Sequence, residues 1–165
     1  MDFILNGRAV KFNGAAHVTL LRALRAMGTT SVKRGCEEGE CGACTVLIDG
    51  RPNKSCMTLA YEVEGKSVLT AEGLVSPDGT PHPVQRAVVE EGAIQCGFCT
   101  PGMIIAAYAL LCENPSPSDE EIKQRLSGNL CRCTGYAGIL RAVRKASELM
   151  RAQVGECRVE GACCK

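Results

Sequence analysis

The stretch GCEEGECGACTV, residues 35–46, is the most informative part of this chain. It sets three cysteines in the pattern Cys36-x4-Cys41-x2-Cys44, and Cys56 follows after eleven further residues. This spacing is typical of the plant-type ferredoxin loop, in which four thiolates hold a [2Fe–2S] cluster. The interleaved glycines allow the loop to turn tightly, so that backbone N–H groups can approach the sulfur atoms. Spacing alone therefore favours iron–sulfur over a four-cysteine zinc site here.

A second set of four cysteines lies further along the chain. Cys96-x2-Cys99 is followed, after thirty-one residues, by Cys131-x-Cys133. Four thiolates again match the ligand number of a [2Fe–2S] cluster. This spacing is less characteristic, however, and taken alone it leaves iron–sulfur and zinc equally open.

The sequence around the first set predicts a small α+β domain. Asn6-Gly7 and Asp49-Gly50 are strong signals for hairpin turns. Apolar residues in 19–27 recur with helical spacing, which predicts an amphipathic helix. Short apolar or β-branched runs predict strands at 3–5, 9–12, 45–48 and 68–69. Together with the glycine-rich cysteine loop, these elements suggest a β-grasp arrangement.

The region 73–83 is rich in glycine and proline and predicts a linker, after which the pattern becomes helical. A first helix begins near Pro83. Thr100-Pro101 is interpreted as an N-cap followed by proline at the first helical position. Ser118 and Glu121 form a capping box that opens a third helix. Apolar residues from Ile139 to Met150 predict a fourth helix, so we expect the second cysteine set in the loops before helices two and four.

These patterns predict an α+β protein with an N-terminal β-grasp, ferredoxin-like [2Fe–2S] domain and a four-helix-bundle [2Fe–2S] domain. The expected boundaries are 1–75 for the first domain, 76–84 for the linker and 85–153 for the second. A cysteine-containing tail, expected to be flexible, covers 154–165 and includes Cys157, Cys163 and Cys164, whose role the sequence leaves open.

Composition excludes several classes of function. The 165 residues carry a net charge of +1, and only 4% are aromatic, so nothing favours nucleic-acid binding. The sequence contains no P-loop and no Ser/His/Asp set, and we expect no substrate chemistry on this chain. No signal peptide or membrane span is recognisable near the N-terminus or elsewhere, which favours a cytoplasmic location.

Three longer motifs extend beyond the cysteines themselves. They are GCEEGECGACTV at 35–46, QCGFCTPGM at 95–103 and GNLCRCTGY at 128–136. In this order they resemble the cluster motifs of the molybdenum hydroxylase (xanthine oxidase) family. The resemblance covers residues 1 to about 152, and the chain is similar to the separate small iron–sulfur subunits of multi-subunit bacterial members.

That resemblance implies partners and an electron path. A large subunit would carry a molybdenum–pterin cofactor and the substrate pocket, a middle subunit would carry FAD, and a dimer of heterotrimers is expected. The substrate would be a purine- or nicotinate-like N-heterocycle, an aldehyde, CO or an aromatic acyl-CoA. Electrons would pass between molybdenum and flavin through the two clusters. The direction of flow stays open, because the aromatic acyl-CoA enzymes run as reductases.

Residue roles follow from the same resemblance. Gln95 corresponds to a glutamine that hydrogen-bonds the pterin, and Cys133 to the ligand that lies against the pterin amino group. The cluster near molybdenum would be held by Cys96, Cys99, Cys131 and Cys133, and the cluster near flavin by Cys36, Cys41, Cys44 and Cys56.

Two other functions remain as alternatives: a free-standing two-cluster ferredoxin-like carrier and a zinc-stabilised interaction module. Glu37 and Glu40 flank first-set cysteines and are expected on a solvated loop rim. His17 and His82 lie outside every motif and are expected at the surface. The basic residues of the last helix are expected to form a solvated face; they are Arg141, Arg144, Lys145 and Arg151.

Overall fold

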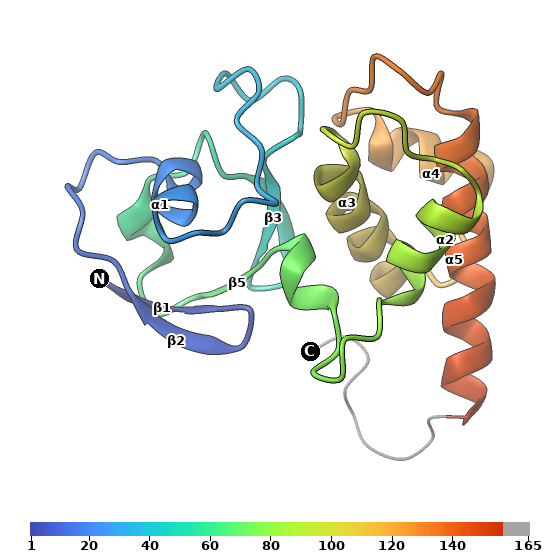
Figure 1. Ribbon diagram of the computed structural model, residues 1–165, viewed down its shortest axis with the longest axis horizontal. Coiled ribbons are helices and arrows are strands. Elements are labelled where there is room, and N and C mark those ends of the chain that lie inside the picture. Colours follow the sequence, from blue (N-terminus) through green and yellow to red (C-terminus); the bar gives the residue numbers. More distant parts are fainter. Residues whose placement is uncertain (157–165) are drawn as a thin grey trace.

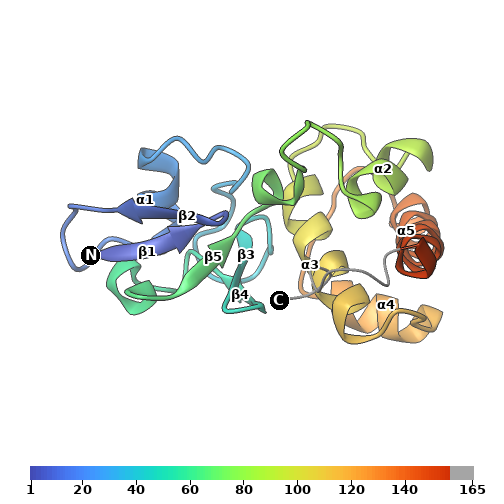
Figure 2. The ribbon, with the colours of Figure 1, turned by 90° about the horizontal axis from the view of Figure 1, so that it is seen from below.

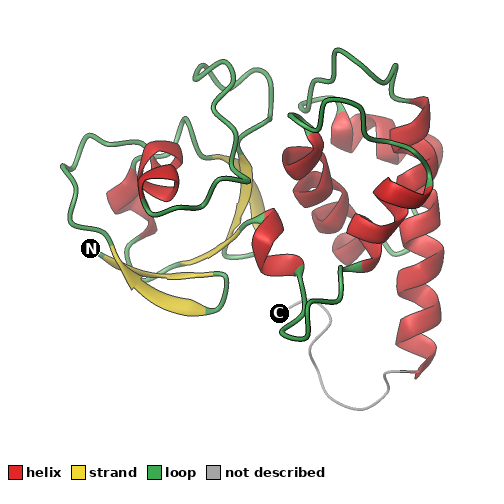
Figure 3. Cartoon of the chain, in the orientation of Figure 1, coloured by secondary structure: helices red, strands yellow, loops and turns green. Residues whose placement is uncertain are grey.

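The computed structural model describes residues 1–156, which form two lobes lying side by side (Figure 1). The first lobe holds a five-stranded sheet and one α-helix, and the second consists of α-helices (Figure 3). A mixed α/β chain with a helical second half is thus confirmed. Of the predicted tail, residues 154–156 end the last helix, and the part from Cys157 onward, with its three cysteines, lies outside the described residues.

The sheet of the first lobe has the strand order β2-β1-β5-β3-β4. Strands β1 and β5 pair in parallel, and the other neighbours are antiparallel. The sequence did not single out the fourth strand, which contains Pro52; proline is tolerated there because β4 is an edge strand. The strands are β1 (Asp2–Leu5), β2 (Arg8–Lys11), β3 (Thr45–Ile48), β4 (Arg51–Lys54) and β5 (Ser67–Leu69).

Both predicted hairpin turns are confirmed. Asn6 and Gly7 have φ angles of 50° and 78°, and Asp49 and Gly50 have 48° and 78°. Positive φ at both central residues defines the type I′ turn, whose twist matches that of the flanking strands. These turns fix the register of β1 on β2 and of β3 on β4.

Helix α1 (Leu20–Ala26) covers the sheet and completes the core of the first lobe. Thr19 is its N-cap, and the hydroxyl oxygen accepts a hydrogen bond from Arg22 N. Leu20, Leu21 and Leu24 are fully buried and pack with the inward-facing residues of β1, β3 and β5. The predicted helix at 19–27 is therefore correct to within its caps.

The second lobe is built around α3, which is buried on nearly all sides from Gly102 to Leu111. Helices α2 and α5 pack closely on each other, and α4 packs on α3 and α5 on the side opposite α2 (Figure 2). This explains why α3 shows no polar face in the sequence. The helices are α2 (Pro83–Glu90), α3 (Thr100–Glu113), α4 (Asp119–Leu126) and α5 (Ala137–Glu156).

The predicted start of α4 is confirmed, whereas the predicted N-cap of α3 is displaced by one residue. Ser118 caps α4 as expected: its hydroxyl accepts from Glu121 N, and the Glu121 carboxylate accepts from Ser118 N at 2.7 Å. The N-cap of α3 is Cys99 rather than Thr100, because the chain already has helical dihedral angles at Cys99 (φ −78°, ψ −18°). Pro101 then occupies the second helical position, where its missing N–H is equally unneeded.

His17 is exposed as predicted, but the prediction for His82 is wrong. His82 caps α2, with Nδ1 accepting from Val84 N at 3.2 Å, and its ring meets Tyr108 edge-on at 5.1 Å. Burial lowers the pKa of His82. A capping role for histidine is uncommon, so nothing in the local sequence signalled it.

The basic residues of α5 are partly exposed, and three of them pair with neighbouring helices. Arg141 and Lys145 meet Glu91 and Glu90 of the α2 region at 3.4 and 3.6 Å, and Arg144 pairs with Asp119 at the start of α4. Such exposed pairs contribute only about 0–1 kcal/mol each. None of the described helices has the length and apolar character needed to cross a membrane.

The two lobes share a packed boundary. Strand β3 is buried on both faces: Val46 and Ile48 point into the core of the first lobe, whereas Leu47 joins the core of the helical lobe. Helix α3 packs on this second face, as Figure 2 illustrates. The short 3₁₀ helix Ala71–Leu74 also joins the helical core. The relative position of the two cysteine sets is thus fixed by core packing.

Candidate iron–sulfur sites

Three loops carry seven of the eight predicted ligands and gather at one end of the molecule, the upper end in Figure 1, whereas Cys56 follows β4. One loop joins α1 to β3, a second joins α2 to α3, and a third joins α4 to α5. The first belongs to the sheet lobe and the other two to the helical lobe. The fold therefore brings segments far apart in sequence to a common edge.

The first set combines surface and core thiols. Cys44 and Cys56 are buried, with 3% and 6% exposure, and form part of the core of the first lobe. Cys36 and Cys41 are partly exposed. Cys36 Sγ accepts hydrogen bonds from the backbone N–H groups of Cys41 and Glu38, each at 3.4 Å. These donors lower the pKa of Cys36 to about 7.

Within the first set, the thiols are close enough to influence one another. Cys36 interacts with Cys41, and Cys56 interacts with Cys44 and more weakly with Cys36. Burial, followed by the neighbouring Cys44 thiol, raises the pKa of Cys56 to about 11. Gly35 makes this packing possible, because a Cβ atom at that position would lie 2.7 Å from Cys41 Sγ.

The second set also forms two pairs, but in a more open place. Cys96 and Cys133 are exposed and their sulfur atoms lie 3.6 Å apart; Cys99 and Cys131 are partly buried and meet each other. Burial raises the pKa of Cys99 to about 12, with the adjacent Cys131 adding to the effect. The N–H of Phe98, and then the Cys133 thiol, lower the pKa of Cys96.

Thr134 and Tyr136 support this second set, although the cysteine spacing predicted no role for either of them. The Thr134 hydroxyl donates to Cys131 Sγ at 3.2 Å, and the Tyr136 hydroxyl accepts from Cys131 N at 2.8 Å. Tyr136 N in turn donates to Thr134 Oγ1 at 3.2 Å, which orients the hydroxyl. Burial would raise the pKa of Cys131, but Thr134 and nearby backbone N–H groups lower it to about 7. The sequence signal that could have predicted this support is the presence of two hydroxyl-bearing residues, Thr134 and Tyr136, just after Cys133.

Gln95 is exposed and directly precedes the exposed Cys96. It therefore lies beside the Cys96–Cys133 pair, on the open side of the second set. The neighbouring surface combines two exposed apolar side chains, Phe98 at 46% and Leu130 at 53%, with basic residues that line the hollow beside Cys96. These are Arg25, Lys33 and Arg34.

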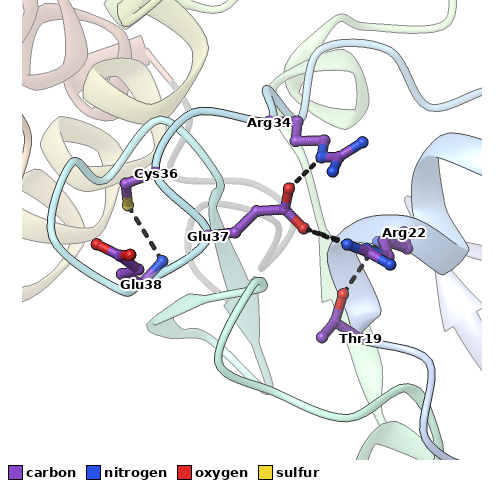
Figure 4. A network of polar contacts seen from close by, with 6 residues as sticks. All are labelled: Thr19, Arg22, Arg34, Cys36, Glu37 and Glu38. Carbon is purple, nitrogen blue, oxygen red and sulfur yellow. Dashed lines mark hydrogen bonds and ion pairs between the residues drawn. The ribbon is translucent and has the colours of Figure 1, made fainter.

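Glu37 is paired with two arginines and is less exposed than the solvated loop rim predicted for it. Its carboxylate turns away from Cys36 and lies between two guanidinium groups, as Figure 4 shows. One carboxylate oxygen is 2.9 Å from Arg22, and the other contacts Arg34. Arg34 and then Arg22 lower the pKa of Glu37. The negative charge beside the first set is thus compensated locally, whereas Glu40 is exposed as predicted.

The donor chemistry fits two-iron clusters. A [2Fe–2S] cluster with four cysteines has two irons, and each iron takes two thiolates. In both sets the thiols interact in pairs, and N–H or O–H donors face a sulfur atom in each set. Among the described residues, no three Cys, His, Asp or Glu side chains converge on a single metal position.

Fold and donor sets together define a class, the proteins that hold two [2Fe–2S] clusters in successive domains. Residues 3–71 match the model of the 2Fe-2S iron-sulfur cluster binding domain, and residues 70–144 match the [2Fe-2S] binding domain. The two matches divide the chain close to the boundary between the lobes.

The chain belongs to the molybdenum hydroxylase (xanthine oxidase) family, among its small iron–sulfur subunits. It is 52% identical over 145 residues to the nicotinate dehydrogenase small FeS subunit of Eubacterium barkeri, covering 87% of this chain and 92% of that one. Identity is 46% over 146 residues to the xanthine dehydrogenase iron-sulfur-binding subunit of Escherichia coli O157:H7, covering 87% and 91%.

A solved structure has the same fold as this chain. In the quinoline 2-oxidoreductase of Pseudomonas putida 86, one chain superposes with a TM-score of 0.88 at 43% identity, covering 92% of this chain and 95% of that one. The three named enzymes act on three different compounds, although their iron–sulfur subunits are alike. The likeness therefore identifies the kind of subunit and does not distinguish among these compounds.

Proposed function

We propose that this chain transfers electrons within a multi-subunit oxidoreductase through two [2Fe–2S] clusters. The observation that carries the proposal is that each cysteine set brings four thiols together and that the strongest interactions between the thiols join them in pairs, which suits two irons per set. When bound, each cluster accepts and releases one electron at a time. The ligands would be Cys36, Cys41, Cys44 and Cys56 in the first cluster, and Cys96, Cys99, Cys131 and Cys133 in the second.

We further propose that the second cluster lies nearest a large molybdenum–pterin subunit and the first nearest an FAD subunit. The exposure of Cys96 and Cys133 supports this order, because a cofactor on another chain can approach these ligands directly. Gln95 would bind the pterin at the same edge. A dimer of heterotrimers in the cytoplasm is the assembly we propose.

The finer architecture is part of the same proposal. The order β2-β1-β5-β3-β4 with α1 across the sheet supports a β-grasp domain at 1–75. The packing of α2 to α5 around α3 supports a four-helix bundle at 85–153, joined by the linker 76–84. The names of the relatives include enzymes of N-heterocycles and of aldehydes, and a substrate of either class would bind on the large subunit.

A redox titration of the full chain, purified without oxygen, tests the proposal. We expect about four irons and four sulfides per chain, two for each [2Fe–2S] cluster, and two distinct paramagnetic signals on reduction. Cys56→Ser should remove one signal and Cys133→Ser the other. A colourless chain that contains zinc would contradict the proposal and favour the interaction module.

A further inference from the structure

Asn129 is a buried polar residue at the boundary between the two lobes, with 4% exposure. It follows α4, and its backbone N–H donates to Leu126 O at 2.9 Å, which ties it to the helical lobe. Its side chain reaches the other lobe instead. Nδ2 donates to Gly42 O at 2.9 Å and to Thr45 Oγ1 at 3.2 Å. One amide thus joins the two lobes where both cysteine loops meet.

The same place holds the most direct connection between the two ligand sets. Leu130 N donates to Cys41 O at 2.8 Å, and Leu130 is the residue before Cys131. A continuous path therefore runs from the Cys41 side chain through its carbonyl, one hydrogen bond and the backbone of Leu130 to Cys131. Nearby, the Lys54 ammonium group donates to Gly128 O, a second link between the lobes.

The backbones approach each other closely because glycines occupy the contact. A Cβ atom on Gly42 would overlap Gly128 O and the Asn129 amide, and a Cβ atom on Gly102 would overlap Gly42 O. Gly42 also has a positive φ of 70°. The Gly42 carbonyl already accepts from the Thr45 hydroxyl at 2.7 Å and from Thr45 N at 3.1 Å within its own lobe. The Asn129 amide is a further donor to this carbonyl and the one that comes from the helical lobe.

We propose that Asn129 is a positioning residue for electron transfer between the two clusters. By binding Gly42 O, it holds the Cys41 carbonyl against Leu130 N–H and fixes the separation of the two ligand loops. This role rests on the proposed function, because it has meaning only if both cysteine sets hold clusters. The Asn129 amide donates to Gly42 O and Thr45 Oγ1 and is buried, so it acts through the loops it joins.

The test compares Asn129→Ala with the wild type and with Asn53→Ala, in the full chain carrying both clusters. Asn53 is a matched control, because its amide donates to Arg51 O within the β3–β4 hairpin and does not bridge the lobes. Two quantities are measured: the magnetic interaction between the two reduced clusters, and the rate at which one added electron equilibrates between them. Both depend on the separation and coupling of the clusters.

For Asn129→Ala we expect unchanged iron content, a weaker magnetic interaction and several-fold slower equilibration; Asn53→Ala should match the wild type. An interaction and a rate equal to the wild type in Asn129→Ala would overturn the role of Asn129. If Asn129→Ala does not fold, Thr45→Val is the second variant, because it removes one partner of the same amide. Thr45→Val should give a smaller change in the same direction. No change in Thr45→Val would also overturn the role of Asn129. A wild-type chain without two interacting clusters would instead overturn the proposed function.

Discussion

The two cysteine sets are built in opposite ways. The first occupies one glycine-rich loop plus a nearby residue, and two of its thiols are buried in the core of its own lobe. The second is assembled from two loops separated in sequence by α3 and α4, and two of its thiols are exposed. Backbone N–H groups serve both sets, and in the second set the Thr134 hydroxyl also donates to Cys131. A local site depends on its own loop, and a non-local site depends on the packing of the lobe around it.

This contrast predicts that losing a ligand has different structural consequences in the two sets. Cys44→Ser should remove the first cluster and unfold the first lobe, because Cys44 is part of that core and cluster binding is coupled to folding. Cys133→Ser should remove the second cluster and stop turnover of the assembled enzyme, while the helical lobe stays folded. Iron content, circular dichroism and turnover with a natural acceptor distinguish these outcomes. An unfolded helical lobe in Cys133→Ser would contradict the proposed difference between the two cysteine sets. Unchanged turnover would contradict the role of Cys133.

The packing between the lobes can be tested at two helical glycines. Gly102→Ala places a methyl group against Gly42 O, and we expect a loss of about 1–3 kcal/mol from overpacking. Gly138→Ala in α5 meets only ordinary contacts and should be neutral, or stabilising by up to about 1 kcal/mol, through higher helix propensity. Thermal unfolding of the two variants, followed by circular dichroism, measures the difference. Equal unfolding temperatures would mean that the contact of α3 with the first loop can relax.

The hydroxyl donor of the second set gives a smaller, selective effect. Thr134→Val removes the hydrogen bond to Cys131 Sγ, which stabilises the more negative reduced cluster, so the reduction potential of that cluster should fall. We expect up to about a tenfold change in the reduction equilibrium, or about 59 mV for one electron. Thr134→Ser should restore the potential, and the first cluster should not change. A shift in both clusters would show that Thr134 acts through the fold.

The smallest expected effect concerns His82, which is remote from both sets. Because burial lowers its pKa in the folded chain, the unfolded chain binds more protons between that lowered value and the usual pKa of about 6.5. Stability from this residue is therefore present above about pH 6.5 and is lost as the pH falls through the folded pKa. His82→Asn keeps a side-chain cap for α2 and should reduce the acid dependence of the unfolding temperature. The exposed His17→Asn is the control, and an unchanged acid dependence in His82→Asn would contradict the assignment.

Much of the fold could be predicted because its signals are local. The type I′ turns at Asn6-Gly7 and Asp49-Gly50, and the capping box at Ser118, depend on a few neighbouring residues whose conformational preferences are strong. The sequence did not predict that His82 is the N-cap of α2, because the burial of His82 determines that role. It also did not predict that Cys99 is the N-cap of α3, because the turn that precedes the helix determines where it begins. Strand β4 was missed because Pro52 weakens the strand signal.

The two cysteine sets also differ in how far the local sequence predicts them. The spacing of Cys36, Cys41 and Cys44 indicates a cluster loop without further knowledge, since one loop must wrap one cluster. The spacing of the second set left zinc open, and only the folded lobe brings Cys96 to Cys133. The pairing of Glu37 with Arg22 and the bridge from Asn129 to Gly42 join residues distant in sequence, so local patterns cannot predict them.

Purification of the tagged chain from its native host, without oxygen, tests the central claim most directly. The partner chains would be identified, and the same sample would be assayed for iron, sulfide, molybdenum and flavin. The account predicts a brown complex with a large molybdenum subunit, a flavin subunit and about four irons per copy of this chain. A chain that purifies alone, with about four irons and no molybdenum, would contradict it and would favour a free-standing electron carrier.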